Sequence, residues 1–369
     1  MIRVVHLRSG QGLYGAERSL LALASATESP LRPVVVSLLR PGREDGLGEA
    51  ARQMGLEAAR IDAPGRLSWR ALGPVVRLAQ GGLLHAHDYK ALWIALAAGA
   101  FARAPVVATF HGDTGHLHRV RAYEALAHWL ARGTSGVAAT SGALAARIRA
   151  VAPRTPIHVI PNGIDIGRLP TEAERRTARQ TLGIPDGAQV VAFVGRLSPE
   201  KGPEVLLRAA RGSGMLVLVA GDGPLRVVLE AKQAGGAVRF LGFLPDVGQV
   251  LAAADLLALP SLTEGLPMAV LEAMAAGVPV VASAVGSLPE VLGDGAGVLV
   301  PPGDVEALQD ALVRLADPGP RHALAVAARA RVESRYGAAG MARTYLERLY
   351  QPALESARGR DRAPALQPR

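Results

Sequence analysis

Two glutamates, Glu264 and Glu272, stand in the segment PSLTEGLPMAVLE (260–272) with seven residues between them. A leucine-rich run ends at Pro260, and we expect a helix to begin near Pro267, because proline suits the first turn of a helix. A carboxylate just before a helix stays ionised readily and accepts hydrogen bonds from a vicinal diol. The pattern predicts two diol-binding carboxylates; a helix cap beside a surface glutamate is the simpler reading of this pair alone.

Two cations stand in a second segment, VGRLSPEKG (194–202), where Arg196 and Lys201 follow an apolar run that ends at Val194. Gly195 permits a tight turn after this run. Two cations beside the start of a helix suit a diphosphate, since their charges add to those of the backbone N–H groups. A solvated basic loop is the alternative explanation.

Glycines follow two further apolar runs. Gly221 stands in AGDGPLR (220–226), while Gly12 and Gly15 stand in RSGQGLYGAERS (8–19). Glycine lets a backbone approach a ligand closely, although an ordinary strand-to-helix turn has the same composition. The first loop lacks the GxGxxG spacing, and no acidic residue closes a second strand about twenty residues later, which disfavours a dehydrogenase.

Three histidines stand at the ends of apolar runs: His85 and His87 in LLHAHD, and His111 directly after Val106–Phe110. A polar group at the end of a strand in an open α/β sheet is placed to contact substrate, and neutral histidine can donate to or accept from a hydroxyl. We expect His85 to be a packing residue. No HExxH pattern or interleaved carboxylates are present, so we expect no metal site.

The 369 residues suggest two domains, and 49% hydrophobic content suits folded cores. The absence of cysteine excludes disulfides and thiolate ligands. Of the net charge of +9, residues 1–165 carry +8 and residues 166–369 carry +1. An anionic substrate, an anionic membrane or nucleic acid would each fit this excess, as would a solvated arginine-rich surface. Without interleaved aromatic residues, we expect no nucleic-acid partner.

Short apolar runs alternate with alanine-rich helical stretches along the whole chain, which predicts α/β domains with doubly wound parallel sheets. Such sheets place ligands beyond the carboxyl ends of their strands, where the residues above stand. The expected strands begin with residues 1–7 and continue with 34–39, 83–87, 106–110, 136–140, 158–160, 190–194, 216–220, 238–241, 256–259, 278–282 and 297–300.

We predict five segments. They are an acceptor-binding Rossmann-like domain (1–165), an interdomain connection (166–188), a donor-binding domain (189–337), a helix that crosses back to the first domain (338–355) and a disordered tail (356–369). The tail is predicted from its four arginines and two prolines.

Taken together, the motifs resemble the family-four retaining glycosyltransferases of the GT-B fold, glycosyl transferases group 1. The resemblance runs through nearly the whole chain and is densest in the second half. Its blocks are VIPNGID (159–165), VGRLSPEKG (194–202), GDGPLR (221–226), FLGFL (240–244), LPSLTEGLPMAVLEAMAAGVPVVAS (259–283) and VGSLPEVL (285–292).

The resemblance implies two Rossmann-like domains that face each other across a cleft, with a nucleoside-diphosphate sugar as donor substrate. It implies catalytic roles for His111, Glu264, Arg196 and Lys201: the first at the reacting sugar, Glu264 on its hydroxyls and the two cations on the diphosphate. Glu272 would bind the ribose, and Phe243 would lie near the base. The donor-binding set is Gly12, Gly15, Arg196, Lys201, Gly221, Phe243, Glu264, Gly265, Leu266 and Glu272.

The resemblance also implies a retaining, hexosyltransferase-like reaction without an essential metal or other cofactor, in which the two cations stabilise the departing diphosphate. We see no securely placed nucleophilic carboxylate near His111, so same-face attack is preferred to double displacement. The donor base, whether uridine, guanosine or adenosine, is left open. The alternatives are a GT-B sugar-nucleotide epimerase or hydrolase, and a catalytically inactive nucleotide-sugar-binding scaffold.

We expect a cytoplasmic protein, because residues 1–7 are too short for a secretion signal and Ala91–Ala102 is too short to span a bilayer. The acceptor would be a glycan or a lipid-linked sugar of cell-envelope or extracellular polysaccharide synthesis. Residues 116–132 predict a basic amphipathic helix with Trp129, which suits peripheral contact with the anionic inner face of the plasma membrane. A helix that packs its apolar stripe into the core is the alternative.

Overall fold

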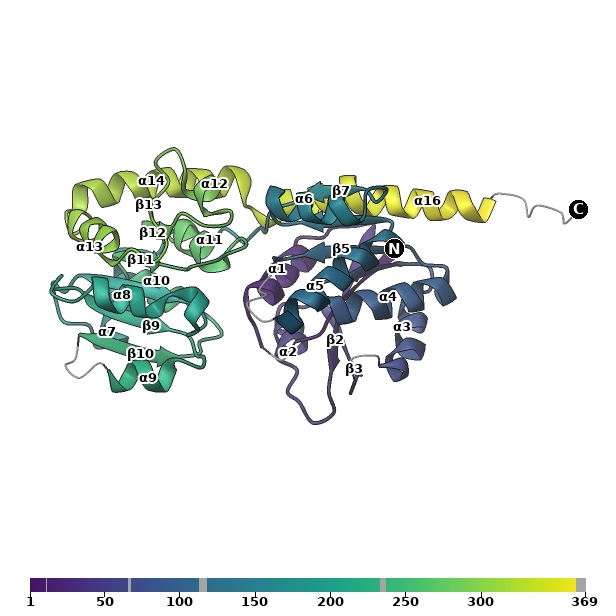
Figure 1. Cartoon of the computed structure of the whole chain (residues 1–369), viewed down its shortest axis with the longest axis horizontal. Coiled ribbons are helices and arrows are strands. Elements are labelled where there is room, and N and C mark those ends of the chain that lie inside the picture. Colours follow the sequence, from purple (N-terminus) through teal and green to yellow (C-terminus); the bar gives the residue numbers. More distant parts are fainter. Residues whose placement is uncertain (11, 66–67, 113–117, 233–236, 363–369) are drawn as a thin grey trace, which may run out of the picture. The chain divides into compact units, whose positions relative to one another are not determined.

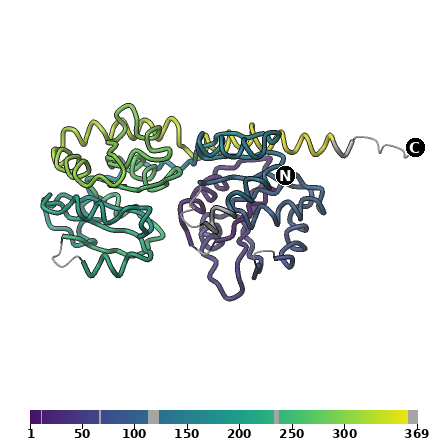
Figure 2. Tube along the Cα trace, viewed as in Figure 1, coloured from purple at the N-terminus to yellow at the C-terminus, as the bar shows by residue number. Residues whose placement is uncertain are grey.

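The computed structural model of the chain describes residues 1–369 except 11, 66–67, 113–117, 233–236 and 363–369. The chain forms two compact units: residues 1–163 together with 338–369, and residues 164–337. Each unit is a parallel sheet with helices, and Figure 2 traces the path of the chain through both of them. The predicted fold class, two doubly wound α/β domains, is confirmed.

Seven parallel strands form the sheet of the first unit, in the order β3-β2-β1-β4-β5-β6-β7. The order reverses between β1 and β4, and this switch point is where open α/β sheets place their ligands. The central strands are almost entirely buried, as expected of a parallel sheet covered on both faces. The strands are β1 (Ile2–Arg8), β2 (Leu31–Leu39), β3 (Glu57–Asp62), β4 (Leu83–Ala86), β5 (Val106–Phe110), β6 (Gly136–Ala139) and β7 (Ile157–Val159).

Helices connect these strands. The helix α4 has fourteen mostly apolar residues, of which six are buried, and the Asp88 carboxylate caps it by accepting from the N–H of Ala91 at 2.9 Å. Among the described residues, no helix is both long and apolar enough to cross a membrane. The helical segments are α1 (Gly15–Ser25), α2 (Gly46–Gln53), η1 (Trp69–Ala71), α3 (Leu72–Ala79), α4 (Tyr89–Ala102), α5 (His118–Leu130), η2 (Ala131–Gly133) and α6 (Gly142–Val151).

The C-terminal segment belongs to the first unit and not to the second (Figure 1). It comprises α15 (Ala338–Tyr345), the π-helical turn η4 (Leu346–Tyr350) and α16 (Gln351–Arg362). Tyr345 and Tyr350 are buried in one apolar cluster with Val4, Leu83 and Val107 from three strands of the sheet. The segment therefore supplies part of the core of a sheet encoded far upstream.

Six parallel strands form the sheet of the second unit, in the order β10-β9-β8-β11-β12-β13. Here the switch point lies between β8 and β11, so the loops that follow these two strands lie side by side. The strands are β8 (Val190–Val194), β9 (Leu216–Ala220), β10 (Val238–Gly242), β11 (Leu256–Leu259), β12 (Val280–Ser283) and β13 (Val298–Val300).

Short helices follow most of these strands, and α14 is the longest in this unit. The predicted helix near Pro267 is present as α11, with Pro267 as its N-terminal cap residue. The helical segments are α7 (Glu172–Thr181), η3 (Pro199–Lys201), α8 (Pro203–Ala209), α9 (Arg226–Ala231), α10 (Gly248–Ala253), α11 (Met268–Ala275), α12 (Leu288–Leu292), α13 (Val305–Arg314) and α14 (Pro318–Arg335).

Three expectations about segments differ from the structure. The predicted connection, 166–188, is part of the second unit, because Arg175 and Arg179 of α7 bind Asp255 at 2.7 and 3.5 Å. The strand β3 was not expected, since its sequence EAARID has few apolar residues. Residues 356–362 of the predicted disordered tail continue α16. Residues 363–369 lie outside the described residues.

Candidate functional site

In the second unit, two loops that carry predicted site residues touch each other. One follows β8 and contains Lys201; the other follows β11 and contains Glu264. Gly202 has a φ of +62°, and a Cβ atom there would lie 2.2 Å from the carbonyl oxygen of Pro260, so only glycine permits this approach. The N–H of Leu262 also donates to the carbonyl of Glu200 at 2.8 Å. The backbone thus fixes the two loops side by side.

The contact between these loops is an ion pair. Lys201 Nζ lies 2.7 Å from both carboxylate oxygens of Glu264, and Ser261 Oγ donates to Glu264 Oε1 at 2.7 Å. The side chain of Glu264 is only 4% exposed, whereas that of Lys201 is 26% exposed. The structure therefore brings together two of the predicted catalytic residues, 63 positions apart in sequence.

The loop after β12 holds Glu264 from its other side. Gly286 has a φ of +59°, and a Cβ atom there would lie 2.2 Å from the carbonyl oxygen of Glu264. Ser287 Oγ donates to the carbonyl of Gly265 at 2.5 Å, and Leu266 is buried in the core of the unit. The segment 264–266 is consequently anchored by its neighbours, which leaves the Glu264 carboxylate little freedom.

Arg196 pairs with a different carboxylate. Its guanidinium contacts Glu200 Oε1, and Ser198 Oγ donates to the same oxygen at 2.6 Å. Burial alone would raise the pKa of Glu200, but hydrogen bonds from Ser198, its own backbone N–H and Arg196 lower it to about 2. The carboxylate is thus ionised at neutral pH, and it holds a guanidinium whose side chain is 51% exposed.

The remaining predicted residues of this unit are Gly221, Phe243 and Glu272. Gly221 has a φ of +146°, and a Cβ atom there would lie 1.9 Å from the carbonyl oxygen of Gly195, which gives this glycine a structural role in packing two loops. Phe243 follows β10 and is 44% exposed. Glu272 lies partly exposed on α11. The contacts of Phe243 and Glu272 with a donor stay predictions.

In the first unit, carboxylates hold Ser9 and Tyr14, two described residues of the glycine-containing segment that follows β1. Asp88 accepts hydrogen bonds from the N–H of Ser9 at 2.5 Å and from its Oγ at 2.8 Å. Glu17, which is 2% exposed, accepts from the N–H of Tyr14 at 3.1 Å. Arg8 joins the two, with Nε 2.8 Å from Glu17 and Nη1 3.9 Å from Asp88.

Gly12 and Gly15 belong to this anchored region. A Cβ atom on Gly12 would lie 2.6 Å from the ring of Tyr14, and Gly15 is the first residue of α1. The anchoring residues Arg8, Glu17 and Asp88 stand close to a switch point of the sheet, at the carboxyl ends of β1 and β4 or in α1. Hydrogen bonds thus fix Ser9 and Tyr14, which stand close in sequence to the glycines that are predicted to contact the phosphates of the donor.

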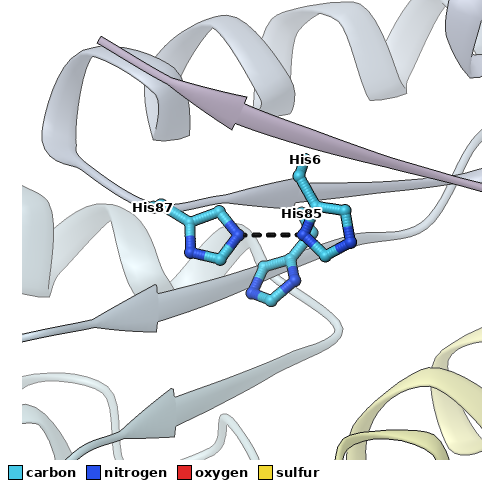
Figure 3. A group of neighbouring side chains, drawn as sticks. All are labelled: His6, His85 and His87. Carbon is cyan, nitrogen blue, oxygen red and sulfur yellow. Dashed lines mark hydrogen bonds between the residues drawn. The ribbon is translucent and has the colours of Figure 1, made fainter. Parts of the chain in front are cut away.

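Histidines form a hydrogen-bonded chain at the same edge of the first sheet. His6 Nδ1 lies 3.1 Å from His87 Nε2, and His87 Nδ1 lies 3.2 Å from His111 Nε2 (Figure 3 shows the first pair). His6 comes from β1, His87 follows β4 and His111 follows β5. The predicted catalytic histidine is therefore the end of a row of three imidazoles.

His85 is fully buried, as expected of a packing residue, and it makes a separate set of hydrogen bonds. Its Nδ1 lies 2.9 Å from the hydroxyl of Tyr350, and its Nε2 lies 2.7 Å from Thr109 Oγ1. The hydroxyl of Tyr345 lies 2.9 Å from the same Thr109 oxygen. His85 consequently links the C-terminal segment to the centre of the first sheet.

Three of these histidines, His6, His85 and His87, lie close enough together to be considered as ligands of a metal ion. One nitrogen from each of His6, His85 and His87 can be chosen so that all three lie within 4.8 Å of one another. Both nitrogens of His85, however, already have hydrogen-bond partners in Tyr350 and Thr109. A metal ion would have to replace one of these bonds, so the geometry favours a hydrogen-bonded cluster.

Burial keeps the histidines of this region neutral. It lowers the pKa of His6 to about 3, and burial together with Arg8 lowers the pKa of His111 to about 3. Burial and the neighbouring histidines place the pKa values of His85 and His87 well below the usual 6.5. Neutral imidazoles carry one N–H each, so every one of them can both donate and accept.

Sequence reasoning missed five residues that the structure places in these clusters: His6, Glu17, Asp88, Glu200 and Ser261. A signal existed for His6, a polar residue among the apolar residues Val4, Val5 and Leu7 of the first strand. A signal existed for Glu200 as well, because it stands between the two predicted cations.

Two doubly wound units, each with polar loops at the carboxyl ends of its central strands, define the GT-B class of fold. Two family models match the chain: "Glycosyltransferase Family 4" over residues 14–168 and "Glycosyl transferases group 1" over residues 174–331. The chain belongs to the family-four glycosyltransferases. The resemblance predicted from its motifs is thereby confirmed.

Two similar enzymes match somewhat less than half of the chain. A D-inositol 3-phosphate glycosyltransferase of Actinosynnema mirum is 41% identical over 189 residues, which is 45% of this chain and 45% of the relative. The enzyme of the same name from Mycobacterium tuberculosis is 39% identical over 173 residues, 43% of this chain and 36% of the relative. The matched part thus spans less than half the length of these relatives.

Solved structures match the whole fold. Anabaena HepE, determined in complex with UDP-glucose, superposes with a TM-score of 0.83 at 26% identity and covers 95% of this chain and 100% of its own. WaaG, a glycosyltransferase involved in lipopolysaccharide biosynthesis, superposes with a TM-score of 0.67 at 19% identity and covers 96% and 98%. The second likeness concerns the fold alone.

Proposed function

We propose that the chain is a glycosyltransferase that moves a sugar from a nucleoside-diphosphate sugar to a hydroxyl acceptor. The observation that carries this proposal is the contact of Lys201 Nζ with both oxygens of Glu264 at 2.7 Å. It joins the loop predicted to bind the diphosphate to the loop predicted to bind the sugar. In a sugar linked to a phosphate, the two groups to be bound are neighbours. A cation for the phosphate beside a carboxylate for the sugar hydroxyls suits such a ligand.

The charges of the site suggest how a donor is received. In the free protein, Lys201 is paired with Glu264 and Arg196 with Glu200, so these four residues sum to no net charge. Arg196 is the more exposed of the two cations and can turn towards a diphosphate. Lys201 would contact the phosphate next to the sugar and keep one oxygen of Glu264 in place. Glu272 would bind the ribose, and Phe243 would lie near the base.

We propose a uridine nucleotide as the first donor to test, because HepE, 26% identical across the fold, was determined with UDP and with UDP-glucose. We further propose retention at the anomeric carbon without an essential metal. Arg196 and Lys201 supply two positive charges where the leaving diphosphate gains negative charge, which is the role a divalent cation plays elsewhere.

We propose that the first unit binds the acceptor, a glycan or lipid-linked sugar at the inner face of the plasma membrane. The excess of positive charge in residues 1–165 supports an anionic acceptor or surface. Leu126 and Trp129 of α5 are 51% and 53% exposed, and the Arg132 guanidinium carbon lies 5.9 Å from the centre of the Trp129 ring. Trp129 and Arg132 form an apolar and basic pair of the kind that suits a membrane interface. The expected helix also covers 116–117, which lie outside the described residues.

Thermal unfolding with UDP, GDP and ADP, each free and with a sugar attached, tests the donor. A ligand at a hundred times its Kd adds about 2.7 kcal/mol to the free energy of unfolding, which is readily measured. The preferred donor is then mixed with candidate acceptors, D-inositol 3-phosphate among them, with and without EDTA, and the product is observed by NMR. An unchanged anomeric configuration and no effect of EDTA are expected. Stabilisation by none of the nucleotides, or release of free sugar alone, would refute glycosyl transfer.

A further inference from the structure

Four aromatic side chains of the first unit form two pairs, Trp69 with Trp93 and Tyr89 with Tyr123, which together we call the aromatic surface. The ring centres of the tryptophan pair lie 5.2 Å apart in an edge-to-face arrangement. Those of the tyrosine pair lie 5.3 Å apart, and their planes are 18° from parallel. Trp69 belongs to η1, Tyr89 and Trp93 to α4, and Tyr123 to α5. Three separate segments thus bring aromatic rings together along α4.

Much of the aromatic surface faces solvent. Trp69 is 66% exposed and Tyr89 is 43% exposed, although tryptophan is on average a largely buried residue type. The chain has only three tryptophans, and two of them stand here. Because Trp69 buries so little of its area, the packing of the unit does not explain why so large a side chain occupies this position.

The start of α4 places the aromatic surface beside the histidine cluster. Tyr89 is the first residue of α4 and stands two positions after His87, whose Nδ1 lies 3.2 Å from His111 Nε2. Between them, Asp88 accepts from the N–H of Ala91 at 2.9 Å, which fixes the point where the helix begins. The aromatic surface is therefore continuous with the carboxyl edge of the sheet, where a substrate is expected.

Hydrogen bonds also hold the backbone that presents Trp69. Lys90 Nζ donates to the carbonyl of Ala63, directly after β3, at 2.6 Å, so the segment that leads to η1 is tied to the start of α4. Ser68 precedes Trp69, and its hydroxyl donates to the carbonyl of Gly65 at 2.8 Å and accepts from the N–H of Gly65 at 3.0 Å. The exposed ring of Trp69 is thus attached to an anchored backbone.

Aromatic rings of this kind suit a sugar. One face of a pyranose ring presents C–H groups with a partial positive charge, and the face of an aromatic ring carries a partial negative charge. The sugar hydroxyls lie around the rim and stay in contact with water. Because Tyr89 and Trp93 are four residues apart on one helix, their Cβ atoms lie about 5–6 Å apart, which is close to the length of one sugar unit in a glycan.

We propose that the aromatic surface binds the acceptor, and that this acceptor is a glycan with at least two linked pyranose rings. The ring nearer to the histidine cluster lies against Tyr89 and Tyr123, and the next ring lies against Trp69 and Trp93. An acceptor with a single ring covers only one of the two pairs. The role of the glycan as acceptor rests on the proposed function, whereas its binding to the aromatic surface requires no transfer.

A glycan array of mono-, di- and trisaccharides, incubated with the full chain and no donor, tests the binding. We expect disaccharides to bind more tightly than their component monosaccharides. Trp69→Ala and Trp69→Leu should each weaken this binding about fivefold, since both lose the aromatic face, whereas Trp69→Phe should retain most of it. Phe101→Ala is the matched control, because Phe101 is an aromatic residue of α4 that is 77% exposed and lies at the other end of the helix.

Three outcomes of the array would overturn the proposal. The first is no binding of the wild-type chain to any di- or trisaccharide, and the second is equal binding of monosaccharides. The third is an equal loss in Trp69→Ala and Phe101→Ala. If Trp69→Ala instead reduced binding to anionic lipid vesicles and left saccharide binding unchanged, the aromatic surface would be a membrane contact, and the proposal would be wrong.

Nitrogen–proton NMR of the indole groups locates the bound glycan. The three tryptophans give three indole N–H signals, which single substitutions to phenylalanine assign. The disaccharide that binds most tightly on the array should shift the signals of Trp69 and Trp93 and leave that of Trp129 in place. A shift of the Trp129 signal alone, or of none of the three, would contradict the aromatic surface as the binding site.

Kinetics separate this inference from the proposed function. If the wild-type chain transferred no sugar from any donor, the proposed function would fail, and the array and the indole signals would still decide whether the aromatic surface binds a glycan. If transfer occurs, Trp69→Ala should raise the KM for the acceptor about fivefold and leave the KM for the donor unchanged. Transfer with an unchanged acceptor KM in this variant would retain the proposed function and reject the aromatic surface.

Discussion

One polar cluster in each unit, at the same topological position, differs in kind from its counterpart in the other unit. In the first unit, His6, His87 and His111 join through neutral hydrogen bonds. In the second, Lys201 with Glu264 and Arg196 with Glu200 join through full charges. Both clusters lie within or directly after central strands next to a switch point, so the fold dictates their place but not their chemistry.

The difference follows from exposure. His6 and His87 are almost completely buried, where an unpaired charge is costly and neutral groups prevail. Lys201 and Arg196 have side chains that are 26% and 51% exposed, so they keep their charge and can be reached by an anion. The comparison teaches that the histidine cluster is built to orient a group, whereas the two ion pairs of the second unit are built to attract and stabilise charge.

The largest effect is expected from Lys201→Ala. This change removes a charge-assisted contact that strengthens as the leaving diphosphate develops, and turnover should fall by an amount equivalent to about 2–4 kcal/mol. The control is Lys232→Ala, which breaks an exposed pair with Glu204 and should leave turnover unchanged. Steady-state kinetics on variants with native circular dichroism checks this. Unchanged turnover in folded Lys201→Ala would show that Lys201 does not stabilise the charge of the leaving diphosphate.

A smaller effect is expected when the pH is lowered. The first unit should lose stability at a higher pH than the second. The pKa of His6 is about 3 when folded against an ordinary 6.5, so the unfolded chain binds more protons between these values and stability falls as pH drops below 6.5. The pKa of Glu200 is about 2 against an ordinary 4.5, so its contribution is lost only below about 4.5.

Hydrogen exchange between pH 6.5 and 5 should therefore show loosening of peptides from β4 and β5 before those from β8 and β11. The groups near the histidines are Arg8 with its partners Glu17 and Asp88, and Tyr345 and Tyr350 beside His85. His6→Leu should reduce the pH dependence of the unfolding free energy by about 1.4 kcal/mol per pH unit, the contribution of one proton. Simultaneous loosening of both units would contradict the comparison.

The two glutamates of the second unit should separate sugar recognition from nucleotide recognition. Glu264→Gln removes the charge that pairs with Lys201 and should mainly reduce transfer, whereas Glu272→Gln should weaken binding of free nucleoside diphosphate by about 1–2 kcal/mol. Isothermal titration calorimetry with free nucleoside diphosphate measures the difference. Equal weakening of this ligand by both substitutions would show that the assignment of sugar and ribose is wrong.

The smallest effect concerns the surface of the first unit. If α5 lies at an anionic membrane, Arg132→Gln should reduce binding to anionic vesicles by about 1 kcal/mol, or about fivefold. Arg176→Gln, an exposed arginine on α7 of the second unit, is the matched control. Vesicle sedimentation at low and high salt checks both variants. If the wild-type protein does not bind anionic vesicles at low salt, the membrane contact is contradicted, and the excess positive charge is better explained by a soluble anionic acceptor.

The sequence predicted the second unit more fully than the first, because its motifs are local. The runs around Arg196, Lys201 and Glu264 each carry their own strand, turn and helix start. Their ion pair joins loops 63 residues apart, and no local pattern encodes such a distance. The motifs identified Lys201 and Glu264 as site residues, but they did not predict the ion pair between them.

The histidine row depended still more on topology. His6 and His85 are register partners in adjacent strands, although 78 residues separate them in sequence. Recognising the row would have required the strand order of the sheet. The same reason explains why Glu17 and Asp88 were missed as anchors of the glycine-containing loop, since each acts on a backbone group through contacts that only the folded sheet creates.

The C-terminal segment has a consequence for biosynthesis. Tyr345, Leu349 and Tyr350 cover apolar residues of the first sheet, including Val4 and Leu83, yet the ribosome makes them only after the entire second unit. Domains usually fold in the order in which they emerge, with the N-terminal one first. Here the core of the first unit is complete only when the C-terminal helices have been made. A nascent or truncated chain therefore exposes apolar sheet surface that a chaperone would have to shield.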